Sequence, residues 1–153
     1  VLFEAPFLEI PKPKIQIISR LIEGQYPNYH EIIPKEYQTE VVLLRDEFIN
    51  QIKTASLFAG HTNEIKMKVK TKEEEIEITS QSSELGENQS NLKAKVKGKD
   101  IEISFNWKYL LDGLTHLESS EVIVGLSGEE GPAVLKPKGD ENYLYVVMPI
   151  KGI

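Results

Sequence analysis

The sequence contains no cysteine, so neither a disulfide framework nor a thiolate metal site can form. This absence favours a reducing compartment, and we expect the protein in the cytoplasm. The sequence also lacks any apolar run that approaches the roughly 20 residues of a membrane helix. Its start lacks the basic and apolar regions of an export signal. We therefore expect no membrane partner.

Motifs for catalysis and for metal binding are missing as well. The three histidines, His30, His61 and His116, lie far apart and outside any His-Glu-x-x-His pattern, so ordinary surface positions explain them best. Residues 125–128 (GLSG) resemble a nucleophile elbow, but Glu129 stands where the final glycine is required. The glycines form neither a phosphate-binding loop nor a dinucleotide fingerprint. We expect no cofactor, no bound metal and no enzymatic activity.

Positive charge is in deficit, because 24 acidic residues stand against 18 basic ones and the net charge is −6. This balance argues against a protein that binds nucleic acid over its whole surface through counterion release. Any contact with DNA therefore has to be local or weak. The length of 153 residues suits one domain, or one domain with a fragment of a neighbour. The first residue is not Met and the opening ten residues read as one arm of a hairpin, so we expect a fragment of a longer protein.

Prolines divide the N-terminal part of the chain into short segments. A proline separates apolar residues 1–5 from 7–10, and a solvated Pro-Lys-Pro-Lys loop at 11–14 precedes a strand pattern at 15–18. Because proline cannot donate to a sheet ladder, these positions mark turns or sheet edges. Residues 24–29 form a turn-rich connector, which predicts a domain boundary before the next strand.

The clearest helix follows a buried strand. Residues 39–44 are rich in β-branched and aliphatic side chains, which is typical of a largely buried strand. Apolar residues then recur at spacings of four, three and four between residues 48 and 59, the period of a helix with one buried face. The pattern predicts a helix over about 46–59, ended by Gly60.

Two strands of opposite charge come next. Residues 65–69 alternate apolar side chains with lysine, and residues 75–79 alternate isoleucine with glutamate or threonine. Each pattern predicts a strand with one face in solvent. The lysine and glutamate faces are complementary, as expected of neighbouring antiparallel strands, and structural pairing explains these charges better than ligand binding does.

The remaining pattern contains a polar stretch, a hairpin signature and a second helix. We expect a loop within residues 80–91, then a hairpin of strands 92–96 and 101–105 around the glycine at 98. Asn106 can cap a helix of about three turns, and three further strands are expected at 122–126, 133–136 and 143–148.

The predicted order is strand, helix, three or four strands, helix, three strands. Two runs of strands, each preceded by a strand and a helix, indicate an α+β domain with two helices packed on one face of two antiparallel sheets.

Four stretches of the sequence together resemble the bacterial DNA sliding clamp family, the beta subunit of DNA polymerase III. They follow in the family's order from residue 19 to the C-terminal tail, and the first is the most specific. They are residues 19–29 (SRLIEGQYPNY) with 32–34 (IIP), residues 55–59 (ASLFA), residues 105–114 (FNWKYLLDGL) and residues 145–150 (YVVMPI).

The resemblance implies a DNA-clamp fold and a division of the chain. Residues 1–23 would be the last hairpin of the second clamp domain, residues 24–34 the interdomain linker, and residues 35–153 the third domain. In the family, two three-domain chains close into a ring on duplex DNA, with helices lining the hole. The implied role is that of a processivity factor of replication, whose partners are duplex DNA, polymerases and the clamp loader.

The resemblance also implies three functional surfaces. Basic residues on the helices would make weak contacts with DNA phosphates, although plain solvent exposure explains them about equally well. A hydrophobic pocket would bind short motifs of the partner proteins, with packing into the core as the alternative for its tail residues. The end of the first helix would close the ring against the other subunit. The residues are Arg45, Lys53 and Lys108 for DNA, Leu57 and Phe58 for ring closure, and Pro27, Ile32, Asn106, Tyr109, Pro132, Val146, Met148, Pro149 and Ile150 for the pocket.

The chain departs from the family pattern at His30 and Glu31, where many members carry basic residues, so its peptide preference is expected to differ. Because most of the second domain is missing, we expect this fragment to bind peptides poorly and to be a monomer or a non-native association. The alternative is a generic α+β interaction or scaffold domain unrelated to replication, in which common strand and helix patterning produces the matches.

Overall fold

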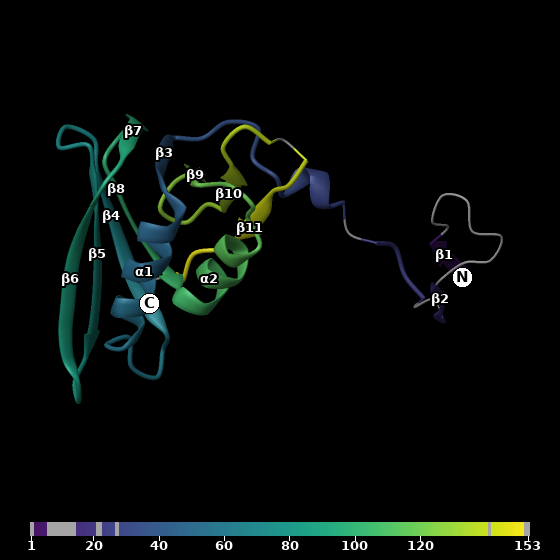
Figure 1. Ribbon diagram of the computed structural model, residues 1–153, viewed down its shortest axis with the longest axis horizontal. Coiled ribbons are helices and arrows are strands. Elements are labelled where there is room, and N and C mark those ends of the chain that lie inside the picture. Colours follow the sequence, from purple (N-terminus) through teal and green to yellow (C-terminus); the bar gives the residue numbers. More distant parts are fainter. Residues whose placement is uncertain (1, 6–14, 21–22, 27, 141, 152–153) are drawn as a thin grey trace.

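The N-terminal strands form a small sheet of their own. The computed structural model describes residues 2–5, 15–20, 23–26, 28–140 and 142–151. Strands β1 (Leu2–Ala5) and β2 (Ile15–Ile18) pair antiparallel with each other and with no other described strand. Figure 1 shows this pair apart from the other strands, at the end of an extended segment that contains the short 3-10 helix η1 (Tyr29–Glu31). The apolar segment expected at residues 7–10 lies outside the described residues.

The rest of the chain repeats one arrangement twice: a strand, a helix and three strands. The extra strand β7 (Lys95–Gly98) lies between the two units. The first unit comprises β3 (Thr39–Leu44), α1 (Arg45–Ser56), β4 (Glu64–Lys70), β5 (Glu75–Ser82) and β6 (Gly86–Lys93), and the second comprises β8 (Ile101–Asn106), α2 (Trp107–Thr115), β9 (Glu121–Leu126), β10 (Ala133–Pro137) and β11 (Tyr145–Val147).

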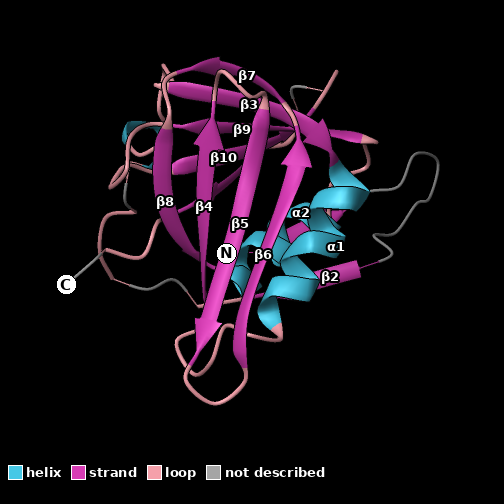
Figure 2. Cartoon of the chain, turned by 90° about the vertical axis from the view of Figure 1, so that its left-hand side faces the viewer, coloured by secondary structure: helices cyan, strands magenta, loops and turns pink. Residues whose placement is uncertain are grey.

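Each of the two larger sheets combines strands from both units. The five-stranded sheet has the order β11-β10-β9-β3-β7, and the four-stranded sheet has the order β6-β5-β4-β8, with antiparallel pairing throughout. The first strand of each unit therefore belongs to the other unit's sheet. Helix α1 contacts α2 and strands β3 to β6, and Figure 2 shows both helices gathered on one side of the four-stranded sheet. This is the predicted α+β class, with two helices on two antiparallel sheets.

Alternating side chains and the helices build one core between the layers. Ile65, Met67 and Val69 of β4 point inward and are at most 1% exposed, while the lysines between them face outward. Phe48 and Ile52 of α1 are fully buried against the same face. Each such side chain contributes about 1.5–3 kcal/mol through its burial, so tertiary packing determines the stability of these short elements.

The predicted charge complementarity between neighbouring strands is confirmed. Lys70 Nζ of β4 lies 3.1 Å from Glu75 Oε1 and 2.8 Å from Glu77 Oε2 of β5, and Lys66 pairs with Glu102 of β8 at 3.0 Å. The hydrogen bond from Lys70 lowers the pKa of the Glu77 carboxyl below its ordinary value. The same bond raises the pKa of Lys70.

The predicted hairpin of residues 92–96 and 101–105 is wrong. Strand β6 ends at Lys93, and β7 pairs with β3 in the other sheet, whereas β8 pairs with β4. The buried hydroxyl of Thr39 explains the crossing, because its Oγ1 donates to the Lys99 carbonyl (2.7 Å) and accepts from the Lys99 N–H (3.2 Å). Gly98, with φ +128°, supplies the backbone conformation that this crossing needs.

The loop expected within residues 80–91 is present but shorter than predicted. Strand β5 continues to Ser82 and β6 begins at Gly86, so only three residues form the turn. β6 is polar because it is the outermost strand of its sheet, where one face contacts solvent and no strict apolar alternation is required. Five strands therefore separate the helices, instead of the three or four predicted.

The helices are shorter than their patterns predicted. α1 ends at Ser56, and the next three residues form a turn with i→i+3 hydrogen bonds, which Gly60 (φ +57°) ends as expected. α2 has nine residues and ends at Thr115, so it is shorter than the three turns predicted. The predicted cap is confirmed, because Asn106 Oδ1 accepts a hydrogen bond from the Lys108 N–H at 3.0 Å.

Candidate functional site

The C-terminal residues connect the two sheets beside α2. Val146 of β11 lies opposite Val134 of β10 in the five-stranded sheet. Beyond β11 the chain continues as the tail (residues 148–151), and the Ile150 N–H donates to the Ser104 carbonyl of β8, at 2.8 Å, in the other sheet. Since α2 begins directly after β8, the tail ends near the N-terminus of α2, and Figure 1 shows it running past this helix.

A glycine in the middle of α2 sets the distance between the helix and β11. A Cβ atom at Gly113 would lie 2.5 Å from Cδ1 of Tyr145 and 2.9 Å from Cδ1 of Leu135. Only a residue without a side chain therefore lets the Tyr145 ring lie this close to the helix. Burial raises the pKa of the Tyr145 hydroxyl, and the nearby Asp112 carboxylate raises it further. The position of β11, and with it the start of the tail, depends on this contact.

The segment before β3 covers the outer face of the five-stranded sheet. The Tyr37 ring lies against Gly125 of β9, where a Cβ atom would be only 2.6 Å from the ring. Lys136 Nζ lies over the same ring, 5.4 Å from its centre. The two neighbours of Val134 on β10 point into the core, so Val134 itself points to the outer face of the sheet. Val134 is the strand partner of Gly125 and is only 1% exposed, so this outer face is covered here. The connector with η1, which leads into β3, is therefore anchored through Tyr37 on the outer face of the five-stranded sheet. Val134 and Val146 belong to the same face.

The residues predicted for a peptide pocket differ widely in exposure. Met148, Tyr109 and Ile32 are 53%, 55% and 52% exposed, which is unusual for large apolar side chains. Val146, Ile150 and Pro132 are half-buried, and Pro149 is buried. The Asn106 side chain already caps α2. Ile150 lies beside Ser104, shortly before α2, and Pro132 precedes Ala133, the strand partner of Val147. Val146 lies on the outer face of the sheet with Val134, and Pro27 lies outside the described residues.

The three basic residues predicted to face DNA are not equivalent. Lys53 and Lys108 are exposed, and Lys108 Nζ lies 5.5 Å from the centre of the Trp107 ring. The Arg45 guanidinium donates to the Leu117 carbonyl after α2 and contacts Asp46 Oδ1 at 2.8 Å. Arg45 therefore connects the start of α1 to the end of α2, and its charge is already paired.

The end of α1 forms the rim of a depression. Leu57, the residue after α1, is 67% exposed, while Phe58 is half-buried. A hollow of about 480 Å³ separates this end of α1 from the turn between β5 and β6, where Leu85 is also exposed. Two exposed leucines at the rim of one hollow are typical of a contact surface.

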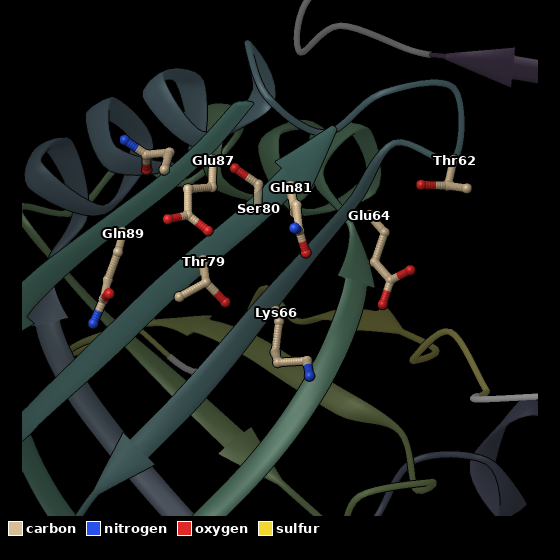
Figure 3. A pocket seen from close by; sticks show the side chains of 9 residues that line it. Thr62, Glu64, Lys66, Thr79, Ser80, Gln81, Glu87 and Gln89 are labelled. Carbon is tan, nitrogen blue, oxygen red and sulfur yellow. The ribbon is translucent and has the colours of Figure 1, made fainter. Parts of the chain in front are cut away.

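The outer face of the four-stranded sheet carries a polar hollow of about 370 Å³ (Figure 3). The labelled side chains, which include Lys66, Thr79 and Gln89, spread over β4, β5, β6 and the turn before β4, and they do not converge on one point. Among the described residues no group of His, Asp or Glu side chains is arranged to hold a metal ion. Within the same part of the chain, no helix has the length and apolar character needed to cross a membrane.

Sequence reasoning missed the residues that position the candidate site. Gly113, Tyr145 and Tyr37 hold the tail and the connector in place, yet none was singled out. The available signal was a glycine inside an amphipathic helix, which costs about 1 kcal/mol relative to alanine and so indicates a packing reason.

Comparisons with known proteins agree with one another. Residues 30–151 match a family model described as the C-terminal domain of the DNA polymerase III beta subunit. The chain is 35% identical over 138 residues to the beta sliding clamp of Staphylococcus aureus and 34% identical over 140 residues to that of Bacillus subtilis. Each match covers 90% of this chain and 37% of the relative, so the chain spans little more than a third of their length.

Solved structures show the same likeness. The DNA polymerase III beta subunit of Thermotoga maritima matches 88% of this chain with a TM-score of 0.82 and 28% identity, over 36% of its own length. The sliding clamp of Bacillus subtilis matches 88% of this chain and 36% of its own length, with a TM-score of 0.81 and 34% identity. The four stretches noted in the sequence therefore reflect kinship, and coincidental strand and helix patterning does not explain them.

Proposed function

We propose, from the premise that the chain belongs to the family of the DNA polymerase III beta subunit, that it supplies one domain of a ring on duplex DNA in the bacterial cytoplasm. A closed ring cannot leave DNA sideways, so it keeps a polymerase on its template through topology and needs only weak contacts. That requirement suits a chain with a net charge of −6. The family is that of a non-catalytic processivity factor, in agreement with the prediction that the chain is not an enzyme.

The proposed domain division follows the sequence expectation. Residues 35–153 would be the third clamp domain, residues 24–34 the linker, and residues 1–23 the last hairpin of the second domain. Two observations support it: the family match covers residues 30–151, and β1 and β2 pair only with each other among the described strands.

The first proposed surface is a peptide-binding pocket between the tail, the connector and α2. The observation that carries it is the path of the tail, which leaves the five-stranded sheet at Val147 and reaches Ser104 beside the start of α2. Met148 and Tyr109 stay exposed along this path. Exposed methionine and tyrosine side chains suit an adaptable apolar groove for short peptides. The occupants would be motifs of polymerases and of the clamp loader.

A peptide titration tests this pocket. We would measure, by fluorescence polarisation, the binding of a labelled clamp-binding peptide from a bacterial polymerase to the full-length protein. Truncation of a central apolar contact typically costs about 1–2 kcal/mol, so Met148→Ala should weaken binding roughly 5- to 30-fold. Leu44→Ala, which removes a similarly exposed side chain on β3, is the matched control. Equal binding by wild type and Met148→Ala would refute the pocket.

The second proposed surface faces DNA. Lys53 and Lys108 would make phosphate-directed contacts, which position the duplex without reading its sequence. Arg45 would hold the two helices in position relative to each other, because its bonds to Leu117 and Asp46 fix the start of α1 against the end of α2. The exposed acids Asp46 and Asp112 on the same helices keep these contacts weak, as sliding requires.

The third proposed surface closes the ring, and it consists of Leu57 and Phe58. Leu57 would enter an apolar contact with the first domain of a second subunit, next to the hollow at the end of α1. The chain by itself should remain a monomer or associate in a non-native way, because that first domain is not part of it. Size-exclusion chromatography with light scattering measures this, and a stable closed ring formed by the 153-residue chain would contradict the proposal.

A further inference from the structure

Strand β7 presents a free edge that carries lysines. It is the outermost strand of the five-stranded sheet and pairs only with β3 among the described strands. Lys95 and Lys97 lie opposite Val42 and Glu40 of β3, and Lys99 follows β7 directly. Alternate side chains along a strand are about 6.7 Å apart, so Lys95 and Lys97 lie on one face of β7 at about this spacing. Lys99 follows beyond the end of the strand, after Gly98 with its φ of +128°, and we call the three the lysine row.

The charge of this lysine row is only partly used inside the chain. The pKa of the Glu121 carboxyl is lowered mainly by the hydrogen bond from Lys138 and also by the charge of Lys95. All three lysines are exposed. Among the residues that the structure describes, none of them forms an ion pair, whereas Lys66, Lys70 and Lys138 each contact a carboxylate. Glu40 offsets one of the three charges, so the row keeps an excess of positive charge in a chain whose net charge is −6.

A shallow hollow of about 340 Å³ adjoins one end of the row. Val42, Leu44 and Ala94 supply apolar lining, and Leu44 remains 48% exposed. Lys93 and Lys95 stand at the hollow on the side of β6 and β7. Glu73, Glu74 and Glu121 also line it, and Glu121 is bonded to Lys138 at 2.7 Å.

We propose that the free edge of β7 and this hollow together bind an extended acidic segment of a partner protein. The segment adds as a strand to β7, places an apolar side chain in the hollow, and sets its carboxylates against Lys95, Lys97 and Lys99. Main-chain hydrogen bonds to a sheet edge supply affinity in this kind of recognition, and alternate side chains supply specificity. The period of a strand matches the spacing of Lys95 and Lys97, so one extended segment can meet every second residue.

The surroundings favour this occupant over two others. A second copy of the chain would bring its own β7 lysines against the same row, and like charges on opposed edges disfavour that pairing. A nucleic acid would leave the apolar lining and the free main-chain groups of β7 unused, and its phosphates would meet Glu73 and Glu74. These two glutamates also direct the carboxylates of a bound peptide away from the hollow and along the row.

The experiment titrates the full chain with a fluorescein-labelled heptapeptide, Leu-Glu-Val-Glu-Val-Glu-Leu. Lys95→Gln combined with Lys97→Gln should weaken its binding at least tenfold, and Leu44→Ala should weaken it several-fold. Lys35→Gln combined with Lys151→Gln removes the same charge at exposed positions that belong neither to β7 nor to the hollow, and should leave binding unchanged. Met148→Ala should also leave it unchanged, so this site and the proposed peptide pocket are tested independently. Thermal melts establish that each variant is folded.

Two further probes separate charge attraction from strand addition. A heptapeptide with N-methylated valines keeps its charge but loses main-chain donors, and it should bind at least tenfold more weakly. Binding equal to that of the unmodified peptide would overturn strand addition. A twelve-nucleotide thymidine oligonucleotide should compete poorly. The proposal fails if this oligonucleotide displaces the peptide through Lys95 and Lys97, or if the double lysine variant binds like the wild type.

Discussion

The contact between Gly113 and Tyr145 allows a prediction with a definite sign. In Gly113→Ala the new methyl group would lie 2.5 Å from Tyr145 Cδ1 and 2.9 Å from both Tyr145 Cε1 and Leu135 Cδ1. Contacts below 3.0 Å require the ring to move, and overpacking of this kind typically costs about 1–3 kcal/mol. The higher helix propensity of alanine returns about 1 kcal/mol. The net loss should therefore be up to about 2 kcal/mol.

Thermal unfolding followed by circular dichroism measures this loss. For a domain of this size, about 1 kcal/mol corresponds to roughly 4 °C, so Tm should fall by up to about 8 °C. In a Tyr145→Ser background the main obstacle is gone, and Gly113→Ala should then be neutral or stabilising by up to about 1 kcal/mol. If Gly113→Ala raises Tm in the wild-type background, or has the same effect in both backgrounds, the contact does not position β11 as argued.

Two further predictions concern the crossing between sheets and the charged face. Thr39→Val leaves the Lys99 N–H and carbonyl without their partner and should lower the free energy of unfolding in urea by about 1–3 kcal/mol. Thr79→Val, on the solvent-facing side of β5, is the control and should change stability little. Equal losses in the two variants would contradict the special role of Thr39. The folded-state pKa of Glu77 is lowered by the hydrogen bond from Lys70, so its contribution is present above the unfolded value near 4.5 and is lost as pH falls through the folded value. The stability difference between wild type and Glu77→Gln should therefore shrink on acidification from pH 5 to pH 2, and a difference that grew instead would show that the paired carboxylate does not stabilise the fold.

The sequence predicted elements whose periodicity is strong and local. The alternation of lysine with apolar side chains over residues 65–69 predicted β4, and the spacing of Phe48 and Ile52 predicted α1. Asn106 was predicted as a cap because an Asn side chain before an apolar helix can accept a main-chain N–H, as its Oδ1 does. These features depend on residues within a few positions of one another.

The errors arose where a long-range contact decides the structure. A glycine flanked by two alternating runs is typical of a hairpin, but the Thr39 hydroxyl, 60 positions away, holds Lys99 and sends β7 and β8 into different sheets. The polar stretch 86–91 contains no apolar alternation, so only its pairing with β5 makes it a strand. For the candidate site, the resemblance indicated the tail and α2, while the contact of Tyr145 with Gly113 became visible only in three dimensions.

The exchange of first strands between the two units has a mechanical consequence. β3 completes the sheet of the second unit and β8 completes the sheet of the first, so each half of the chain supplies one strand to the sheet of the other half. Cutting the polypeptide at the β7 crossing would leave two interlocked halves that are still paired, whereas either half produced alone would lack a strand and expose a bare sheet edge. Melting should accordingly occur as a single event, and a ring built from such units would resist opening inside a domain and yield first at the joints between them.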